Sequence, residues 1–192
     1  MGGICPFCRT TNPSSVGSKL ALTQKRADAK DPVAIGFIAF GYYARDHGLP
    51  QDVPRAVKLW TEAADLGDLD AHYRLGYLYH CTSGEQTEED KEKGLRHLQH
   101  AAIQGHPHSR CALGVHECIS GNYTLAVQHC MISAKVGDVN SLDVIKDMFM
   151  KGHATKAQYA EALKGYRDAS EETKSPQREV AKAFYSTFKY LG

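Results

Sequence analysis

The chain has 192 residues, of which 42% are hydrophobic and 23% are charged, and its formal net charge is +1. This composition is ordinary for a globular protein, and so small a charge produces no global field that would recruit nucleic acid or acidic lipid. No stretch approaches the roughly 20 apolar residues of a membrane span, and the first residues lack the apolar core of a signal peptide. We therefore expect an intracellular protein, cytoplasmic or nuclear, with neither nucleic acid nor membrane as a partner.

The N-terminal part divides into a loop and a helix. Residues 1–17 are rich in Gly, Pro and Ser and are expected to form a flexible segment, whereas residues 18–30 predict a capping helix with a basic outer face. Asp31-Pro32 then starts a second helix, because Asp is a good N-cap and Pro at the first helical position loses no intrahelical hydrogen bond.

Two alternating patterns of small and large residues repeat through the rest of the chain. The pattern of the first helix of each pair, helix A, recurs four times at intervals of 32 to 38 residues, beginning at Ala34, Ala71, Ser109 and Ser141. The pattern of the second helix, helix B, recurs three times, as Ala56-x3-Trp60-x3-Ala64-x2-Gly67, Gly94-x3-Leu98-x3-Ala102-x2-Gly105 and Ala126-x3-Cys130-x3-Ala134-x2-Gly137. Self-similarity at this period indicates stacked helix hairpins.

Local signals place the ends of these helices. Asp52 is expected to cap the first helix B, which buries a stripe through Trp60, and Gly67 is expected to end it in the left-handed conformation. Thr155 stands three residues before Gln158, as in a capping box that opens a later helix B, and Thr87 before Asp90 is a weaker relative of this motif.

The C-terminal part, residues 167–192, predicts a polar linker followed by a capping helix. The stretch Asp168–Lys174 is polar, and Ser175-Pro176 is a helix-start signal. The last helix carries Val180, Phe184, Phe188 and Leu191 on one face, which would cover the exposed end of the stack. An alternative is that this helix lies in the concave groove.

The segments AHYRLGYLYHCTSG and KGLRHLQHAAIQGHPHSRCALG, together with DVPRAVKLWTEAADLGDLDAHYRLG, resemble Sel-1-like repeats, a tetratricopeptide-like class of α-solenoid. The resemblance covers roughly residues 31–166. It implies an all-α fold, namely a right-handed α-solenoid of about four Sel-1-like helix hairpins with terminal capping helices.

The resemblance also implies a protein-interaction adaptor whose concave face, lined by helices A, holds a partner protein or peptide. We expect the partner-binding residues at helix-A positions outside the packing pattern: Phe37, Gly41, His72, Arg74, Tyr77, Arg110 and His116. No phosphate-binding loop or hydrolase motif occurs in the sequence, so we expect no enzymatic activity and no cofactor.

A second motif near the N-terminus, Cys5-Pro6-Phe7-Cys8-Arg9, resembles the closing CPxC of a RING zinc finger. This resemblance implies an alternative function as the substrate-recruiting part of a RING-type E3 ubiquitin ligase, with a ubiquitin-conjugating enzyme as a partner. Only four residues precede Cys5, however, and two thiolates cannot complete a structural zinc site. We therefore expect zinc only if residues absent here complete the finger, and the sequence leaves open whether Met1 is the true start.

Cysteines and histidines in the repeats invite two further interpretations. Cys111 and Cys118 lie seven residues apart on one predicted helix, too far apart for a disulfide, so we expect the repeat cysteines to pack as small hydrophobic residues. His97 and His100 share a helix face, but His97 occupies the packing position held by Leu59 in the first repeat. A structural or surface role is therefore expected rather than a metal site.

Overall fold

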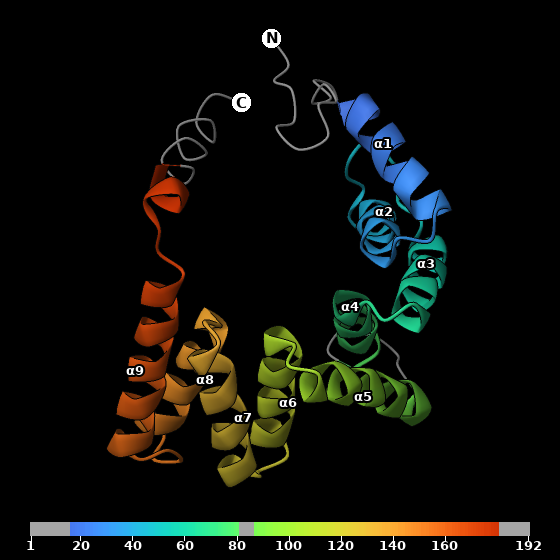
Figure 1. Ribbon diagram of the computed structural model, residues 1–192. Coiled ribbons are helices and arrows are strands. Elements are labelled where there is room, and N and C mark those ends of the chain that lie inside the picture. Colours follow the sequence, from blue (N-terminus) through green and yellow to red (C-terminus); the bar gives the residue numbers. More distant parts are fainter. Residues whose placement is uncertain (1–15, 81–86, 181–192) are drawn as a thin grey trace. The chain divides into compact units, whose positions relative to one another are not determined.

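The computed structural model describes residues 16–80 and 87–180, and the chain divides into two compact units, residues 1–106 and 107–192. The described residues form nine complete α-helices and the start of a further one at Pro176, and no strand (Figure 1). The first unit holds α1 (Val16–Asp28), α2 (Pro32–Ala44), α3 (Val53–Asp65), α4 (Leu69–His80) and α5 (Glu88–Ile103). The second unit holds α6 (Pro107–Ile119), α7 (Tyr123–Lys135), α8 (Val139–Met150) and α9 (Lys156–Glu172).

The helices pair as the repeat pattern predicts, and the all-α solenoid class is confirmed. In the first unit α2 packs on α3 and α4 packs on α5, while α1 packs on α2. In the second unit α6 packs on α7 and α8 on α9, and α7 also contacts α9. The four hairpins α2–α3, α4–α5, α6–α7 and α8–α9 are the four expected repeats.

Side chains at the ends of the helices satisfy backbone amides as expected. The carboxylate of Asp31 accepts hydrogen bonds from the amides of Val33 and Ala34 at 3.1 and 3.3 Å, and Asp52 accepts one from Arg55 at 2.9 Å. The predicted capping boxes at Thr87 and Thr155 are both formed. These bonds matter because the first amides of a helix have no partner within it.

The turns that join one hairpin to the next are short and alike. Three residues separate α3 from α4 and α7 from α8, and each turn has a glycine with a positive φ at its centre: 91° at Gly67 and 93° at Gly137. A side chain at this φ would be strained, which explains the glycine. The loops inside the hairpins vary in length, from eight residues between α2 and α3 to three between α6 and α7.

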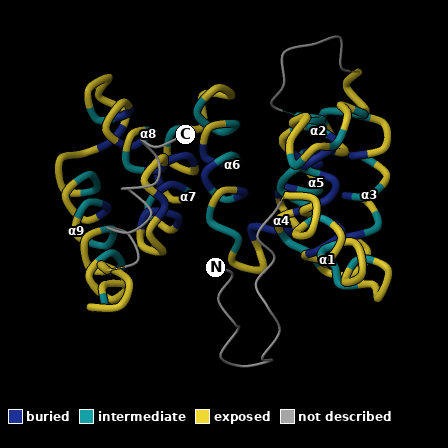
Figure 2. Tube along the Cα trace, turned by 90° about the horizontal axis from the view of Figure 1, so that it is seen from above, coloured by how far each residue is buried: buried dark blue, intermediate teal, exposed yellow. Residues whose placement is uncertain are grey.

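The core of the first unit lies between α2, α3 and α4, where small residues alternate with large ones. Trp60 is only 2% exposed and packs against Tyr43, with ring centroids 5.3 Å apart, while Leu75 closes the core from α4. Helix α1 has no buried residue, and its Leu20 and Ala27 only partly cover the core, as expected of a terminal helix (Figure 2).

In two of the hairpins, α4–α5 and α6–α7, a glycine lets the two helix backbones approach closely. A Cβ atom on Gly76 would lie 2.6 Å from Cγ of Leu98 and 3.0 Å from the carbonyl oxygen of Gly94. The second unit repeats the arrangement, because a Cβ on Gly114 would lie 2.5 Å from Sγ of Cys130. Each glycine therefore accommodates the large residue that faces it across the hairpin.

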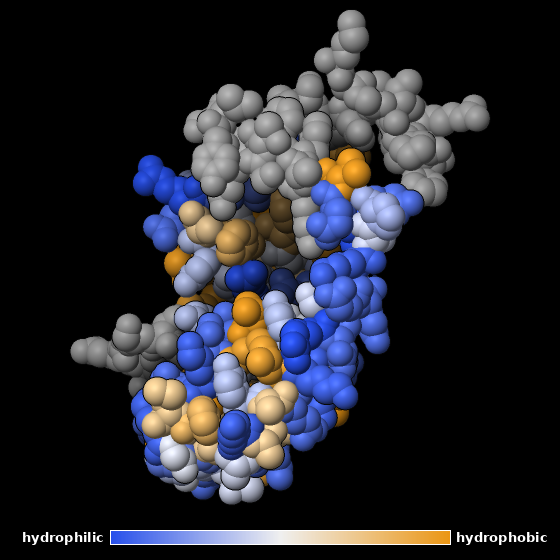
Figure 3. Space-filling view, turned by 90° about the vertical axis from the view of Figure 1, so that its left-hand side faces the viewer, coloured by the Kyte–Doolittle hydropathy of each residue, from blue (hydrophilic) through white to orange (hydrophobic). Residues whose placement is uncertain are grey.

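The second unit has its core between α7, α8 and α9, around Cys130, Ile145 and Met148. Helix α9 runs to Glu172, so most of the expected linker Asp168–Lys174 is helical; its Ala, Glu and Asp residues tolerate a helix in the absence of a breaker. Figure 3, seen from the side that carries α9, shows mainly hydrophilic residues with small apolar areas between them. A further helix starts at Pro176, as expected, and its apolar residues after Val180 lie outside the described residues.

We predict that Gly76→Ala lowers the free energy of unfolding by about 1–3 kcal/mol, because the new methyl group would displace Leu98 or separate α4 from α5. Urea denaturation followed by circular dichroism would measure the change. The matched control is Gly17→Ala in α1, where a Cβ would meet nothing within 4 Å and stability should stay equal or rise by up to about 1 kcal/mol. Equal effects of the two substitutions would contradict the close-approach argument.

Candidate partner-binding pocket

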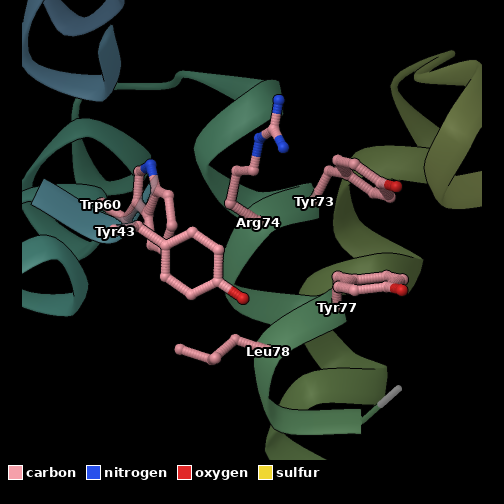
Figure 4. A pocket seen from close by; sticks show the side chains of 6 residues that line it. All are labelled: Tyr43, Trp60, Tyr73, Arg74, Tyr77 and Leu78. Carbon is pink, nitrogen blue, oxygen red and sulfur yellow. The ribbon is translucent and has the colours of Figure 1, made fainter. Parts of the chain in front are cut away.

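Helix α4 carries a pocket of about 240 Å³ in the first unit. Tyr43 of α2 and Trp60 of α3 lie together on one side of α4, Tyr73 and Tyr77 extend from its other side, and Arg74 lies between them (Figure 4). Leu78, one turn after Arg74 on the same helix, completes the lining. The pocket therefore combines an aromatic and aliphatic wall with a single cation.

The rings of the pocket are held by the core and by each other. Tyr73 and Tyr77 lie at neighbouring positions on α4, with ring centroids 6.1 Å apart and planes tilted by 48°. Tyr73 also contacts the ring of His106 at 5.2 Å. Trp60 is buried, whereas Tyr77 is 47% exposed and open to an incoming group. A rigid aromatic wall of this kind offers a large apolar contact at low cost in conformational entropy.

The predicted partner-binding residues separate into different environments. Arg74 and Tyr77 line the pocket, and Phe37 is 44% exposed on α2, where its ring stacks on His47 at 4.4 Å. Arg110 and His116 are half-buried on α6 and belong to the second unit. For all four residues a role in binding a partner stays a prediction.

The placement of Gly41 on the partner-binding surface is wrong. Gly41 is buried, and a Cβ there would lie 2.9 Å from Cδ1 of Leu49 and 3.5 Å from the carbonyl oxygen of Asp46. The loop after α2 folds back over the helix at this point and needs the space that the glycine leaves. Gly41 is therefore a packing residue that offers a partner no side chain.

His72 faces the partner helix of its own hairpin instead of an open surface. Its Nδ1 lies 2.9 Å from Nδ1 of His97 on α5, and its ring stacks on that of His100 at a centroid distance of 4.2 Å. One of the two nitrogens must carry a hydrogen and donate the hydrogen bond, and the other must accept that bond. Within residues 16–80 and 87–180, no group of three or more His, Cys, Asp or Glu side chains is arranged to hold a metal ion.

Burial of this histidine pair weakens its basicity. Burial, and then the neighbouring His72, Lys93 and His100, lowers the pKa of His97 to about 4. Burial and the nearby His100 lower the pKa of His72 as well. Both rings are therefore neutral at pH 7 and serve the packing of α4 on α5.

We predict that the free energy of unfolding falls as the pH is lowered from about 6.5 to about 4, because the unfolded chain protonates His97 in this range while the folded chain does not. Urea titrations at several pH values would measure the slope. His97→Leu, which introduces the residue found at the matching position Leu59, should reduce the slope. An unchanged slope in this variant would contradict the assignment.

In the second unit, a buried carboxylate organises the turn between α7 and α8. Asp138, 4% exposed, accepts hydrogen bonds from the hydroxyl and amide of Ser141 at 2.6 and 3.0 Å, and from the Ser133 hydroxyl at 3.2 Å. Nδ1 of His108 lies 3.0 Å from its other oxygen. Burial opposes ionisation, but the Ser141 hydrogen bonds and His108 outweigh it and lower the pKa of Asp138.

We predict that Asp138→Ala lowers the free energy of unfolding of the second unit by about 2–4 kcal/mol at pH 7, because several donors lose a charged acceptor. The contribution of Asp138 to the free energy of unfolding depends on its negative charge, so this contribution should decrease as the pH falls below about 4. The control is Asp143→Ala on the exposed face of α8, which should change stability by less than about 0.5 kcal/mol. Equal losses in both variants would contradict the network.

The described cysteines Cys111, Cys118 and Cys130 are free thiols. Cys111 and Cys130 are buried side by side between α6 and α7, and the adjacent Cys111 thiol together with burial raises the pKa of Cys130. Cys130 is therefore protonated at neutral pH, and it fills the space above Gly114 as a small hydrophobic residue. Cys5, Cys8 and Cys81 lie outside the described residues, so the predicted zinc motif and the role of Cys81 stay predictions.

Sequence comparison identifies the repeats of the first unit. Residues 35–68 and 69–106 match the family model of the Sel1 repeat. The two matched segments contain α2–α3 and α4–α5, so the pocket on α4 lies where these segments meet. No curated protein sequence matches the chain.

Solved structures extend the similarity of fold beyond these repeats. A Sel1 repeat protein from Oxalobacter formigenes is 22% identical, with a TM-score of 0.66 over 83% of this chain and 66% of that one. A protective antigen of uropathogenic Escherichia coli strains, displaying an SLR fold, is 17% identical, with a TM-score of 0.62 over 85% of this chain and 39% of that one. The chain thus spans less than two thirds of both proteins, and at these identities the likeness shows the fold alone.

Among the described residues, none of the helices combines the length and the apolar character that a membrane span requires.

A smaller pocket, about 190 Å³, lies in the second unit between α6 and α8. It is lined by Val115, Cys118, Ile119, Val144, Asp147, Met148 and Lys151. No aromatic ring of the described residues lines it. The pocket on α4 is the stronger candidate for recognition because aromatic and arginine side chains dominate binding energies at protein interfaces.

Proposed function

We propose that this chain is a protein-interaction module that binds a partner segment by taking one of its apolar side chains into the pocket on α4. The observation that carries the proposal is the set of tyrosines around that pocket, of which Tyr77 is half exposed on a helix A of a Sel1 repeat. Buried tyrosine and arginine anchors are typical of interface hot spots. The two Sel1 repeats add support, since stacked helix hairpins generally bind other proteins.

The size of the pocket favours a peptide side chain as its occupant. Its volume of about 240 Å³ is below the roughly 300–1,000 Å³ of small-molecule sites and suits one or two apolar side chains. The polar groups on its lining are phenol hydroxyls, an indole N–H and a guanidinium, which act as donors for recognition. We therefore propose a binding role in preference to an enzymatic one, with no cofactor.

The alternative function, a substrate-recruiting part of a RING-type ubiquitin ligase, depends on Cys5 and Cys8. No feature of the described residues favours it over a general interaction module, so it stays a prediction from the sequence.

We predict that peptides selected on the protein from a phage-displayed library of random 12-residue sequences bind the Tyr77→Ser variant at least tenfold more weakly, since the substitution removes an exposed wall of the pocket. Fluorescence anisotropy with synthetic copies of the peptides would give the affinities. Ile103→Ser, a change of an 81% exposed apolar residue of the same unit that does not line the pocket, should bind within about twofold of wild type. Peptides that bind both variants equally would refute the pocket as the binding site.

A further inference from the structure

The guanidinium of Arg74 lies over two aromatic rings at the pocket. Its guanidinium carbon lies 4.8 Å from the centroid of Phe40 on α2 and 5.7 Å from that of Tyr73 on α4. Cation–π contacts of this kind restrict the movement of a guanidinium without using its N–H groups.

No hydrogen-bond acceptor among residues 16–80 and 87–180 occupies the N–H groups of Arg74. Its nearest carboxylate is that of Asp70, one turn earlier, where Nε lies 3.7 Å from Oδ2 and both side chains are partly exposed. That distance is too long for a hydrogen bond, and exposed pairs of this kind contribute little. Among the described residues, none accepts a hydrogen bond from Arg74 within normal distance. Its terminal fork is thus a donor pair beside an apolar pocket.

We propose that the segment bound at α4 carries an aspartate or glutamate next to its apolar anchor, and that the carboxylate pairs in a bidentate manner with Arg74. This inference rests on the proposed function and names the chemistry of the partner. A planar fork of two parallel N–H groups matches the two oxygens of a carboxylate, and charge-assisted pairs of this geometry are among the strongest hydrogen bonds in proteins. Because the rings of Phe40 and Tyr73 already restrict the guanidinium, less entropy is lost when the pair forms.

Other ligand chemistries fit the pocket less well. Four aromatic rings could surround a quaternary ammonium, but the cation of Arg74 on the same lining would repel it. A phosphorylated side chain is usually bound by a cluster of arginines, whereas Arg74 is the one basic residue among the described residues that line this pocket. A single carboxylate balances the single charge.

The test uses the selected peptides as probes, made with amidated C-termini so that only side-chain carboxylates are present. We expect the selection to enrich Asp or Glu beside an apolar residue. Replacing that acid by Asn or Gln should weaken binding to the wild-type protein about 10- to 100-fold, the loss expected for a charge-assisted hydrogen-bonded pair. Arg74→Gln should weaken the acidic peptide equally, and Arg74→Lys should restore only part of the affinity, since an ammonium lacks the fork.

The decisive measurement is the double-mutant cycle between Arg74→Gln and the amide peptide. If the two groups pair, the peptide substitution should have almost no further effect on the Arg74→Gln variant. The control variant is Arg96→Gln on α5, an exposed arginine also paired one turn away, with Glu92, which should leave binding within about twofold of wild type. Thermal unfolding of each variant would verify that the fold is intact.

The outcomes separate this inference from the proposed function. If the selected peptides depend on Tyr77 but carry no enriched acid, or if the acid matters equally with and without Arg74, the carboxylate pairing is refuted while the pocket stands. If no selected peptide depends on Tyr77, both proposals fail. Coupling between Arg74 and the acid that weakens with added salt would support the inference.

Discussion

The structure depends on how closely the two helices of a hairpin can approach. At Gly76 the backbone of α4 lies directly against Leu98 and the backbone of α5, and at Gly114 the backbone of α6 lies against Cys130. Small residues at these points bring the helices together, and the large residues facing them fill the remaining space. Close packing of this kind maximises dispersion contacts and leaves no room for an added methyl group.

The same packing creates the pocket. Because Trp60 is buried beneath Tyr43, its ring forms a fixed base on one side of α4, while Tyr73 and Tyr77 extend from the other side of that helix. The core of the first unit and its candidate binding surface therefore share residues. A recognition site built on helices in this way is more rigid than one built on loops.

Local features of the fold could be predicted from the sequence, whereas the candidate site could be predicted only in part. The caps at Asp31 and Asp52, the glycine turn at Gly67 and the capping box at Thr155 were predictable because each depends on residues a few positions apart. Their physical basis is a short-range hydrogen bond or a backbone angle.

The errors concern residues whose environment is set by distant parts of the chain. Gly41 is buried because Leu49 folds over it, and His72 turns inward because His97 and His100 face it from the next helix. Arg74 and Tyr77 were expected at a binding surface, but Tyr43 and Tyr73 were missed, since the repeat pattern does not mark residues that contact a neighbouring hairpin. Aromatic residues clustered outside the packing pattern were the available signal.

The contrast between uniform turns and variable loops determines where this architecture tolerates additional sequence. The turns at Gly67 and Gly137 span three residues and each depends on one glycine at positive φ, so an inserted residue would disrupt the connection that places the following helix. The loops inside the hairpins already range from three to eight residues without altering how their helices pair. A fluorescent tag or an epitope is therefore best placed at a hairpin tip such as the one between α2 and α3.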